Sequence, residues 1–156
     1  MLLEFDRAPS VVPDDPSRCH AARGTHHTLP SLAVPDLAGR RILVLDDDPL
    51  AAIIATLDLE DAGASFTLVH CVASALRELD RAARNGVPFD AAVLDVNLGG
   101  GATSHAVAER LRADRVPFVF HTADRGTDTG NAPLVVKPAV PGALARTLAD
   151  EIAGSH

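Results

Sequence analysis

Residues 41–54 read RILVLDDDPLAAII, a short apolar run followed by three acids, a proline and a helical pattern. The apolar run consists of β-forming residues without polar alternation, which is typical of a parallel strand covered on both faces. Asp48 precedes Pro49, as an N-cap residue precedes the favoured first-turn proline of a helix. The stretch therefore predicts a central strand, then a helix, with two further acids left at the strand end.

The rest of the chain repeats this alternation of strand and helix. After the first strand at 42–45, apolar runs predict strands at 66–69, 91–94, 116–120 and 134–136. Apolar residues with helical spacing lie between them or after the last one: Leu50, Ile53, Ile54 and Leu57; Leu76, Leu79, Ala82 and Ala83; Val107, Ala108 and Leu111; Leu144, Leu148 and Ile152. Right-handed crossovers then give a doubly wound α/β domain with an open, five-stranded parallel sheet.

Residues 1–38 differ in composition from the rest of the chain. They contain five prolines and show no apolar period: Pro9, Pro13, Pro16, Pro30 and Pro35. Such a composition buries too little apolar surface to offset the entropy of ordering the chain. We expect a disordered N-terminal extension over residues 1–38, followed by one folded domain.

Charge and hydropathy exclude two classes of partner. The formal net charge is −7 and the 14 basic residues are scattered, whereas phosphate binding needs clustered Lys and Arg. No run of eighteen apolar residues and no basic, apolar secretory start is present. We therefore expect no nucleic-acid partner and no membrane association, and a cytoplasmic location.

Polar residues follow four of the five predicted strands. Asp46 and Asp47 follow the first, Asp95 the third, Thr122 the fourth and Lys137 the fifth. Ligands of doubly wound sheets bind beyond the carboxyl ends of the strands, so these side chains are expected at one edge. Carboxylates gathered there need a cation, and oxygen ligands favour Mg²⁺. An aspartate beside Mg²⁺, a hydroxyl and an ammonium suits phosphoryl transfer onto a carboxylate.

Four segments carry a resemblance to a known family. They are ILVLDDDP (42–49), AAVLDVNLGG (91–100), FVFHTA (118–123) and LVVKP (134–138). In this order they resemble the receiver domain of two-component response regulators, over residues 39–154. The resemblance implies a flavodoxin-like fold and a single-domain response regulator that works through protein contacts. It further implies that the protein is not an enzyme beyond its own phosphorylation and slow dephosphorylation.

The resemblance also implies a role for each matching residue. Asp95 would be the phosphoacceptor, supplied by a sensor histidine kinase or a histidine phosphotransfer protein. Mg²⁺ would be held by Asp46, Asp47 and Asp95 with the backbone carbonyl of Asn97. Two more positions complete the implied site, with a cis bond expected before the proline: the switch hydroxyl of Thr122 and the phosphate-contacting Lys137, followed by Pro138.

Two positions depart from the family pattern. Thr122 and Lys137 are 137 − 122 = 15 positions apart, where the family usually shows about twenty-two, so roughly two turns are missing at 3.6 residues per turn. The fourth helix is therefore expected to be short or replaced by a loop, as in a subgroup of stand-alone receivers that VPFVFHTAD resembles. Leu134 stands where the usual switch has Tyr or Phe, so an order change in the 123–133 loop is the expected signal.

Two other functions fit parts of the pattern. Asp46 and Asp48 form a D-x-D after the first strand, as in haloacid-dehalogenase-like phosphohydrolases, although Pro49 fits that pattern poorly. The short fourth helix and Leu134 also suit a degenerate receiver that acts only as a binding module.

Overall fold

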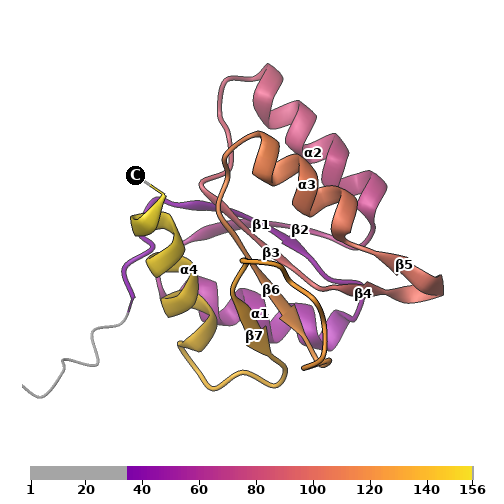
Figure 1. The fold of residues 1–156 in the computed structure, drawn as a ribbon. Coiled ribbons are helices and arrows are strands. Elements are labelled where there is room, and N and C mark those ends of the chain that lie inside the picture. Colours follow the sequence, from indigo (N-terminus) through magenta and orange to yellow (C-terminus); the bar gives the residue numbers. More distant parts are fainter. Residues whose placement is uncertain (1–34, 156) are drawn as a thin grey trace, which may run out of the picture. The chain divides into compact units, whose positions relative to one another are not determined.

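The computed structural model describes residues 35–155, which form a five-stranded parallel sheet with helices on both faces (Figure 1). The strand order is β2-β1-β3-β6-β7. The strands are β1 (Arg41–Leu45), β2 (Ser65–Val69), β3 (Ala91–Leu94), β6 (Phe118–Thr122) and β7 (Leu134–Val136). The helices are α1 (Pro49–Asp61), α2 (Val72–Arg84), α3 (His105–Ala113) and α4 (Ala143–Gly154). The predicted fold class, a flavodoxin-like doubly wound sheet, is confirmed.

Two cores form on the two faces of the sheet. Successive side chains of a strand point to opposite faces, so Leu43 of β1 packs with α2 and α3, and Val44 packs with α1 and α4. Helices α1 and α4 lie on one side of the sheet in Figure 1, and α2 and α3 on the other. Burial on both faces explains why the central strands are apolar throughout.

The strand order determines where a ligand can bind. From β1 the chain goes to its neighbour β2, and then crosses to β3 on the other side of β1. The order of a doubly wound sheet reverses at such a point, and the crevice lies beyond the carboxyl ends of the two strands. Here these ends are Leu45 and Leu94, the residues that directly precede Asp46 and Asp95.

The predicted apolar stripe of α1 is wrong, because its residues face solvent. Leu50, Ile53, Ile54 and Leu57 are 68%, 53%, 46% and 53% exposed. The helix packs instead through Ala52, Ala55, Thr56 and Leu59. Both sets repeat at i, i+3, i+4 and i+7, so periodicity alone cannot choose between them. The buried set contains two alanines, which let the helix approach the sheet closely.

Strand β6 is shifted by two residues from its predicted range of 116–120. The amide of Val116 donates to the Leu111 carbonyl at the end of α3, and Arg115 has a positive φ of 57°. Pro117 has no N–H to donate to a ladder, and the strand begins after it, at Phe118. Thr122, expected just beyond the strand, is its last residue.

No helix lies between β6 and β7, which confirms the prediction that a loop replaces the fourth helix. At the other end of the domain, Leu37 is buried in the core and its amide donates to the Ala62 carbonyl at 2.9 Å. The extension was predicted to reach residue 38, whereas the folded part already includes Leu37. Residues 1–34 of that extension lie outside the described residues.

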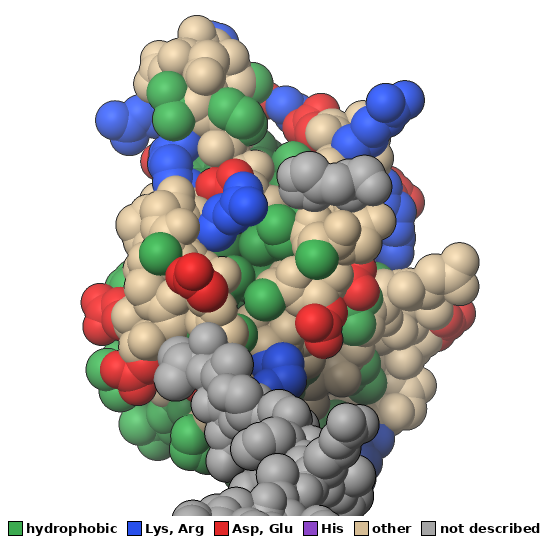
Figure 2. Space-filling view, turned by 90° about the vertical axis from the view of Figure 1, so that its left-hand side faces the viewer, with side chains coloured by type: hydrophobic (Ala, Val, Ile, Leu, Met, Phe, Trp, Pro, Cys, Tyr) green, Lys and Arg blue, Asp and Glu red, His purple; other side chains and the backbone are tan. Residues whose placement is uncertain are grey.

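Among residues 35–155, no helix combines the length and apolar character needed to cross a bilayer. Figure 2 shows one face of the molecule, where acidic, basic and hydrophobic side chains are interspersed.

The two faces of α1 predict opposite mutational outcomes. Leu59→Ala removes buried methyl groups and should lower the free energy of unfolding by about 3 kcal/mol. Leu57→Ala lies on the exposed face and should change it by less than about 0.5 kcal/mol. Urea unfolding followed by circular dichroism measures both. Equal losses in the two variants would contradict this packing of α1.

Candidate functional site

Three carboxylates meet at the carboxyl end of the sheet. Asp46 and Asp47 follow β1, and Asp95 follows the neighbouring β3. One carboxylate oxygen from each lies within 4.8 Å of the others. The backbone holds them there, because the Asp46 amide donates to Val69 of β2 at 3.1 Å and the Asp95 amide donates to Leu45 of β1 at 2.8 Å.

Lys137 supplies the positive charge that faces this cluster. It is the only lysine among the chain's 14 basic residues. Its Nζ donates to Asp46 Oδ2 at 2.7 Å and to Asp95 Oδ2 at 2.8 Å. The Lys137 side chain is 14% exposed, and those of Asp46 and Asp95 are 3% and 10% exposed. An ion pair this deep is screened far less by salt than a surface pair.

Burial and the neighbouring charges have opposite effects on the pKa values of Asp46 and Lys137. The pKa of Asp46 is raised, mainly by burial and further by the charge of Asp95, although the hydrogen bond and charge of Lys137 act to lower it. Burial alone would lower the pKa of Lys137, but the hydrogen bonds and charges of Asp46 and Asp95 outweigh it, so the pKa is raised. The ammonium therefore stays protonated, while the cluster retains more negative than positive charge.

Asp47 is positioned by a hairpin that the sequence analysis did not identify. Strand β4 (Asn97–Leu98) pairs with β5 (Ala102–Thr103) in antiparallel fashion, around a 3-10 turn at Gly99–Gly101. The Gly99 amide donates to Asp47 Oδ2 at 2.6 Å. A Cβ at Gly99 would lie 2.9 Å from that oxygen. Three consecutive glycines were the available signal for such a close approach.

The other predicted site residues lie around the carboxylates. The Asn97 amide donates to Asp95 Oδ1 at 3.3 Å. Thr122 is buried at the end of β6, the strand next to β3, and its Oγ1 accepts from the Asp124 amide at 3.4 Å. The Lys137 amide donates to the Thr122 carbonyl at 2.9 Å, which joins the ends of β6 and β7. The Lys137–Pro138 bond is cis, as expected.

The third acid of the opening stretch has a structural role. Asp48 Oδ1 accepts from the amides of Leu50 at 2.9 Å and Ala51 at 3.4 Å, so it is the N-cap of α1. Its own amide donates to Asp46 Oδ1 at 3.0 Å. Of the three consecutive acids, two face the cluster and one begins the helix.

The donor set fits Mg²⁺. Three carboxylates provide hard oxygen ligands within 4.8 Å of one another, and one lysine does not neutralise them. Mg²⁺ takes one or two carboxylates together with water and phosphate oxygens. Asp46, Asp47 and Asp95 are the residues that could hold it, and the peptide carbonyls after Asp95 lie nearby in sequence.

His121 and His105, which flank the site in sequence, do not join the cluster. His121 alternates with Thr122 along β6 and so points to the α1 and α4 face of the sheet. Burial, with the nearby charge of Lys137, lowers the pKa of His121 to about 4. His105 begins α3, with its ring centroid 6.4 Å from that of Phe120.

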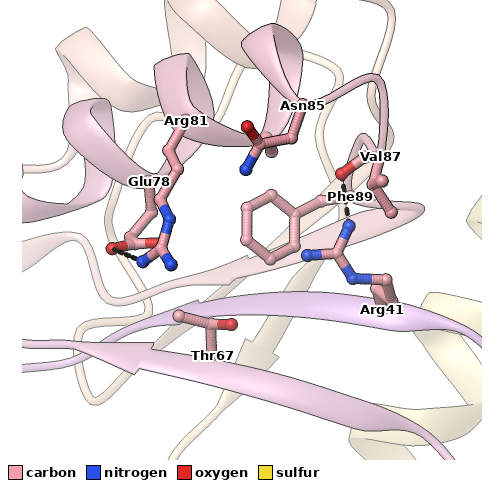
Figure 3. A pocket seen from close by; sticks show the side chains of 8 residues that line it. Arg41, Thr67, Glu78, Arg81, Asn85, Val87 and Phe89 are labelled. Atoms are coloured by element: carbon pink, nitrogen blue, oxygen red, sulfur yellow. Dashed lines mark hydrogen bonds and ion pairs between the residues drawn. The ribbon is translucent and has the colours of Figure 1, made fainter.

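A cavity lies beside the amino-terminal end of β1, at the other end of the strand from Asp46 (Figure 3). Its volume is about 430 Å³. The Arg41 guanidinium stacks on the Phe89 ring at 5.0 Å and donates to the Val87 carbonyl. Glu78 pairs with the exposed Arg81 at 3.7 Å. These charged side chains already have partners, so the cavity has no role in the acidic site.

Gly99→Ala should weaken Mg²⁺ binding roughly tenfold, because the new methyl group displaces the carboxylate of Asp47. Titration with MgCl₂, followed by the backbone amide shifts of residues 46–48 and 95–97 in ¹⁵N NMR spectra, gives the dissociation constant. Gly126→Ala is the matched control, since its Cβ lies at an ordinary 3.4 Å from Asp124. Equal affinities for the two variants would show that the Gly99 contact does not position Asp47.

The pKa of His121 predicts a loss of stability in acid. Its pKa of about 4 lies below the ordinary 6.5, so the folded state binds the proton more weakly than the unfolded chain. The stability is complete above pH 6.5 and falls as the pH drops towards 4. Between pH 7.5 and pH 5, the parent protein should lose about 2 kcal/mol more than His121→Gln in urea unfolding. Parallel losses would contradict a neutral, buried imidazole.

Among the comparisons with known proteins, the one with solved structures finds matches. No protein-family model matches the chain. No curated protein sequence matches it either. Among solved structures, the response regulator PhyR from Brucella abortus is 20% identical, with a TM-score of 0.66 over 78% of this chain and 51% of its own. This chain therefore spans about half the length of that protein.

Two further structures are matched over nearly their whole length. A response regulator receiver protein from Sinorhizobium medicae is 21% identical, with a TM-score of 0.62 over 75% of this chain and 97% of its own. SdrG from Sphingomonas melonis is 34% identical, with a TM-score of 0.60 over 74% of this chain and 95% of its own. With this identity over nearly the whole length of SdrG, and with a five-stranded parallel sheet that carries an acidic cluster at the β1 and β3 ends, the chain belongs to the receiver-domain family of response regulators.

Proposed function

We propose that Asp95 accepts a phosphoryl group from a sensor histidine kinase or a histidine phosphotransfer protein, in a Mg²⁺-dependent reaction in the cytoplasm. The observation that carries the proposal is the double contact of Lys137 with Asp95 and Asp46 at 2.8 and 2.7 Å, inside a cluster of three carboxylates. An ammonium beside a carboxylate is suited to contact the oxygens of a phosphoryl group attached to it.

The transfer exchanges one bond to phosphorus for another. A carboxylate oxygen of Asp95 bonds to phosphorus as the bond from phosphorus to the donor imidazole nitrogen breaks. The imidazole leaves with the electron pair. Bound Mg²⁺ would supply charge neutralisation on the phosphoryl oxygens.

Residues of this chain have separate tasks in the transfer. Asp46, Asp47 and Asp95, with the Asn97 carbonyl, would hold the ion. Lys137 would hold a phosphoryl oxygen at Asp95. The Thr122 hydroxyl accepts from the Asp124 amide and keeps its own proton to donate to another oxygen.

The alternative of a haloacid-dehalogenase-like phosphohydrolase would use Asp46 as nucleophile and Asp48 as acid. Asp48 instead caps α1, with both hydrogen bonds to its Oδ1. The Asp46 carboxylate is not accessible to solvent, since Asp46 is 2% exposed and paired with Lys137. These contacts favour Asp95 as the modified residue. A degenerate receiver that only binds is the second alternative.

Signalling through protein contacts needs a segment that responds to the phosphoryl group. The loop 123–133 follows Thr122, whose Oγ1 accepts from the Asp124 amide, and it ends before Leu134, which pairs with Phe120. A new hydrogen bond from the Thr122 hydroxyl would therefore act on the start of this loop. We propose that phosphorylation changes the order of residues 123–133.

Acetyl phosphate tests the proposed chemistry. With Mg²⁺, the parent protein should gain one phosphoryl group by intact mass spectrometry, and Asp95→Asn should gain none. Asp46→Asn removes a proposed ion ligand, so its labelling should be at least tenfold slower. Chelation of Mg²⁺ with EDTA should abolish labelling of the parent.

The alternatives give different results in the same experiment. Labelling that survives in Asp95→Asn but disappears in Asp46→Asn would favour the phosphohydrolase. A folded parent protein that incorporates no phosphate with Mg²⁺ present would favour a binding module.

A further inference from the structure

The cavity beside the amino-terminal end of β1 has the size of a small-molecule site. It lies between α2 and the edge of the sheet formed by β1 and β2, and the loop between α2 and β3 closes it (Figure 3). Its volume of about 430 Å³ falls within the roughly 300–1,000 Å³ typical of such sites. The acidic cluster is at the opposite end of β1, so a molecule in this cavity would bind apart from it.

The inner wall of the cavity is apolar. Phe89 and Ala82 are 5% and 7% exposed and belong to the core on the α2 and α3 face of the sheet. Val87 lines the same cavity and is 49% exposed, so it lies at the rim. A ligand that enters between them meets an aromatic ring on the inside and an aliphatic side chain at the mouth.

Arg41 brings a positive charge into this wall that no described carboxylate neutralises. Its guanidinium lies 5.0 Å from the centroid of the Phe89 ring, and its Nη1 donates to the carbonyls of Val87 and Pro88. All of these partners are neutral. No ion pair of the described part of the chain includes Arg41, so the charge can still attract an anion.

The unused edge of this guanidinium has the geometry of a carboxylate site. Arginine has five N–H donors, and Nη1 is the nitrogen of Arg41 that bonds to described residues. The N–H groups of Nε and Nη2 remain, and such a pair can bind both oxygens of one carboxylate. Figure 3 shows one terminal nitrogen bonded to Val87 and the other directed towards Phe89.

Arg41 is also held in place before any ligand arrives. The stacking on Phe89 and the bonds to two carbonyls fix the orientation of its planar group. A side chain that is already ordered loses little conformational freedom on binding, which favours affinity.

The remaining polar groups of the wall add no net charge. Glu78 and Arg81 form an ion pair at 3.7 Å within α2. The Thr67 hydroxyl and the Asn85 amide form no hydrogen bond with any described residue through their side chains. They face the cavity from β2 and from the end of α2 (Figure 3). One uncompensated positive charge therefore remains, beside two neutral groups that can bond to a polar substituent.

We propose that this cavity binds a small aromatic carboxylate. The carboxylate would accept from Nε and Nη2 of Arg41, and the ring would lie against Phe89 and Ala82. A flat ring suits a wall made of an aromatic side chain and a guanidinium plane. A single negative charge matches the single uncompensated charge of the wall, and an inorganic anion would leave the apolar wall uncovered.

The inference goes beyond phosphoryl transfer and does not depend on it. Arg41 is the first residue of β1, and Asp46 follows the last. Asp95→Asn should therefore bind the carboxylate as the parent does. Loss of acetyl-phosphate labelling would end the proposed function and leave this site unaffected, and the reverse also holds.

Benzoate tests the site, with benzamide as the neutral analogue of the same shape. In ¹³C NMR titrations of the full chain, benzoate should shift the methyl signals of Ala82 and Val87 and the ring signals of Phe89. It should bind about tenfold more tightly than benzamide, the effect of one charge-assisted contact.

Two arginines of equal charge separate a direct contact from a general attraction. Arg41→Gln should reduce the affinity for benzoate to that for benzamide. Arg84→Gln is the matched control, because Arg84 lies in the last turn of α2 and does not line the cavity, and it should change the affinity less than about twofold. Circular dichroism checks that each variant is folded.

Arg41→Lys keeps the charge and removes the planar edge. It should weaken benzoate about fivefold, because an ammonium cannot bind both oxygens in the same plane. This variant also decides the question if Arg41→Gln does not fold.

Three outcomes would overturn the proposal. Equal affinities for benzoate and benzamide would show that the wall does not recognise the carboxylate. Equal weakening by Arg41→Gln and Arg84→Gln would assign the binding to overall charge. No shift at Ala82, Val87 or Phe89 with millimolar benzoate would show that the cavity does not admit an aromatic anion.

Discussion

The paired contacts of Lys137 with Asp46 and Asp95 are the interaction on which the acidic site depends. Carboxylates this close repel one another, and the described site offers one ammonium against three of them. These contacts join residues 91 and 42 positions apart in sequence. They also connect β7, at the edge of the sheet, to the ends of β1 and β3 near its centre. The excess negative charge is what makes a divalent cation favourable there.

The two faces of β6 separate two kinds of interaction. Thr122 lies at the acidic end of the sheet, where its backbone carbonyl binds the amide of Lys137. His121 points to the other face, into a mainly apolar cavity beside α1. A single strand end therefore borders both the proposed phosphoryl site and this cavity.

Much of the fold and of the acidic cluster was predictable. Runs of β-forming residues indicate the five strands, and the rule that ligands bind at strand ends predicts that Asp46, Asp47, Asp95 and Lys137 lie together. The errors have physical causes. The α1 helix carries two stripes with the same period, so the pattern does not show which one is buried. Strand β6 begins two residues later than predicted because Val116 belongs to the turn after α3 and Pro117 has no N–H for a strand hydrogen bond.

The sequence by itself determined the parallel α/β architecture, the missing fourth helix and the identity of the acids, because these follow from local patterns and spacing. Only the tertiary structure decided which stripe of α1 faces solvent, that Gly99 holds Asp47, and that His121 is buried without a partner. Each of these depends on which surfaces approach one another in space. Contacts between residues 52 positions apart, such as Gly99 with Asp47, leave no periodic trace in the chain.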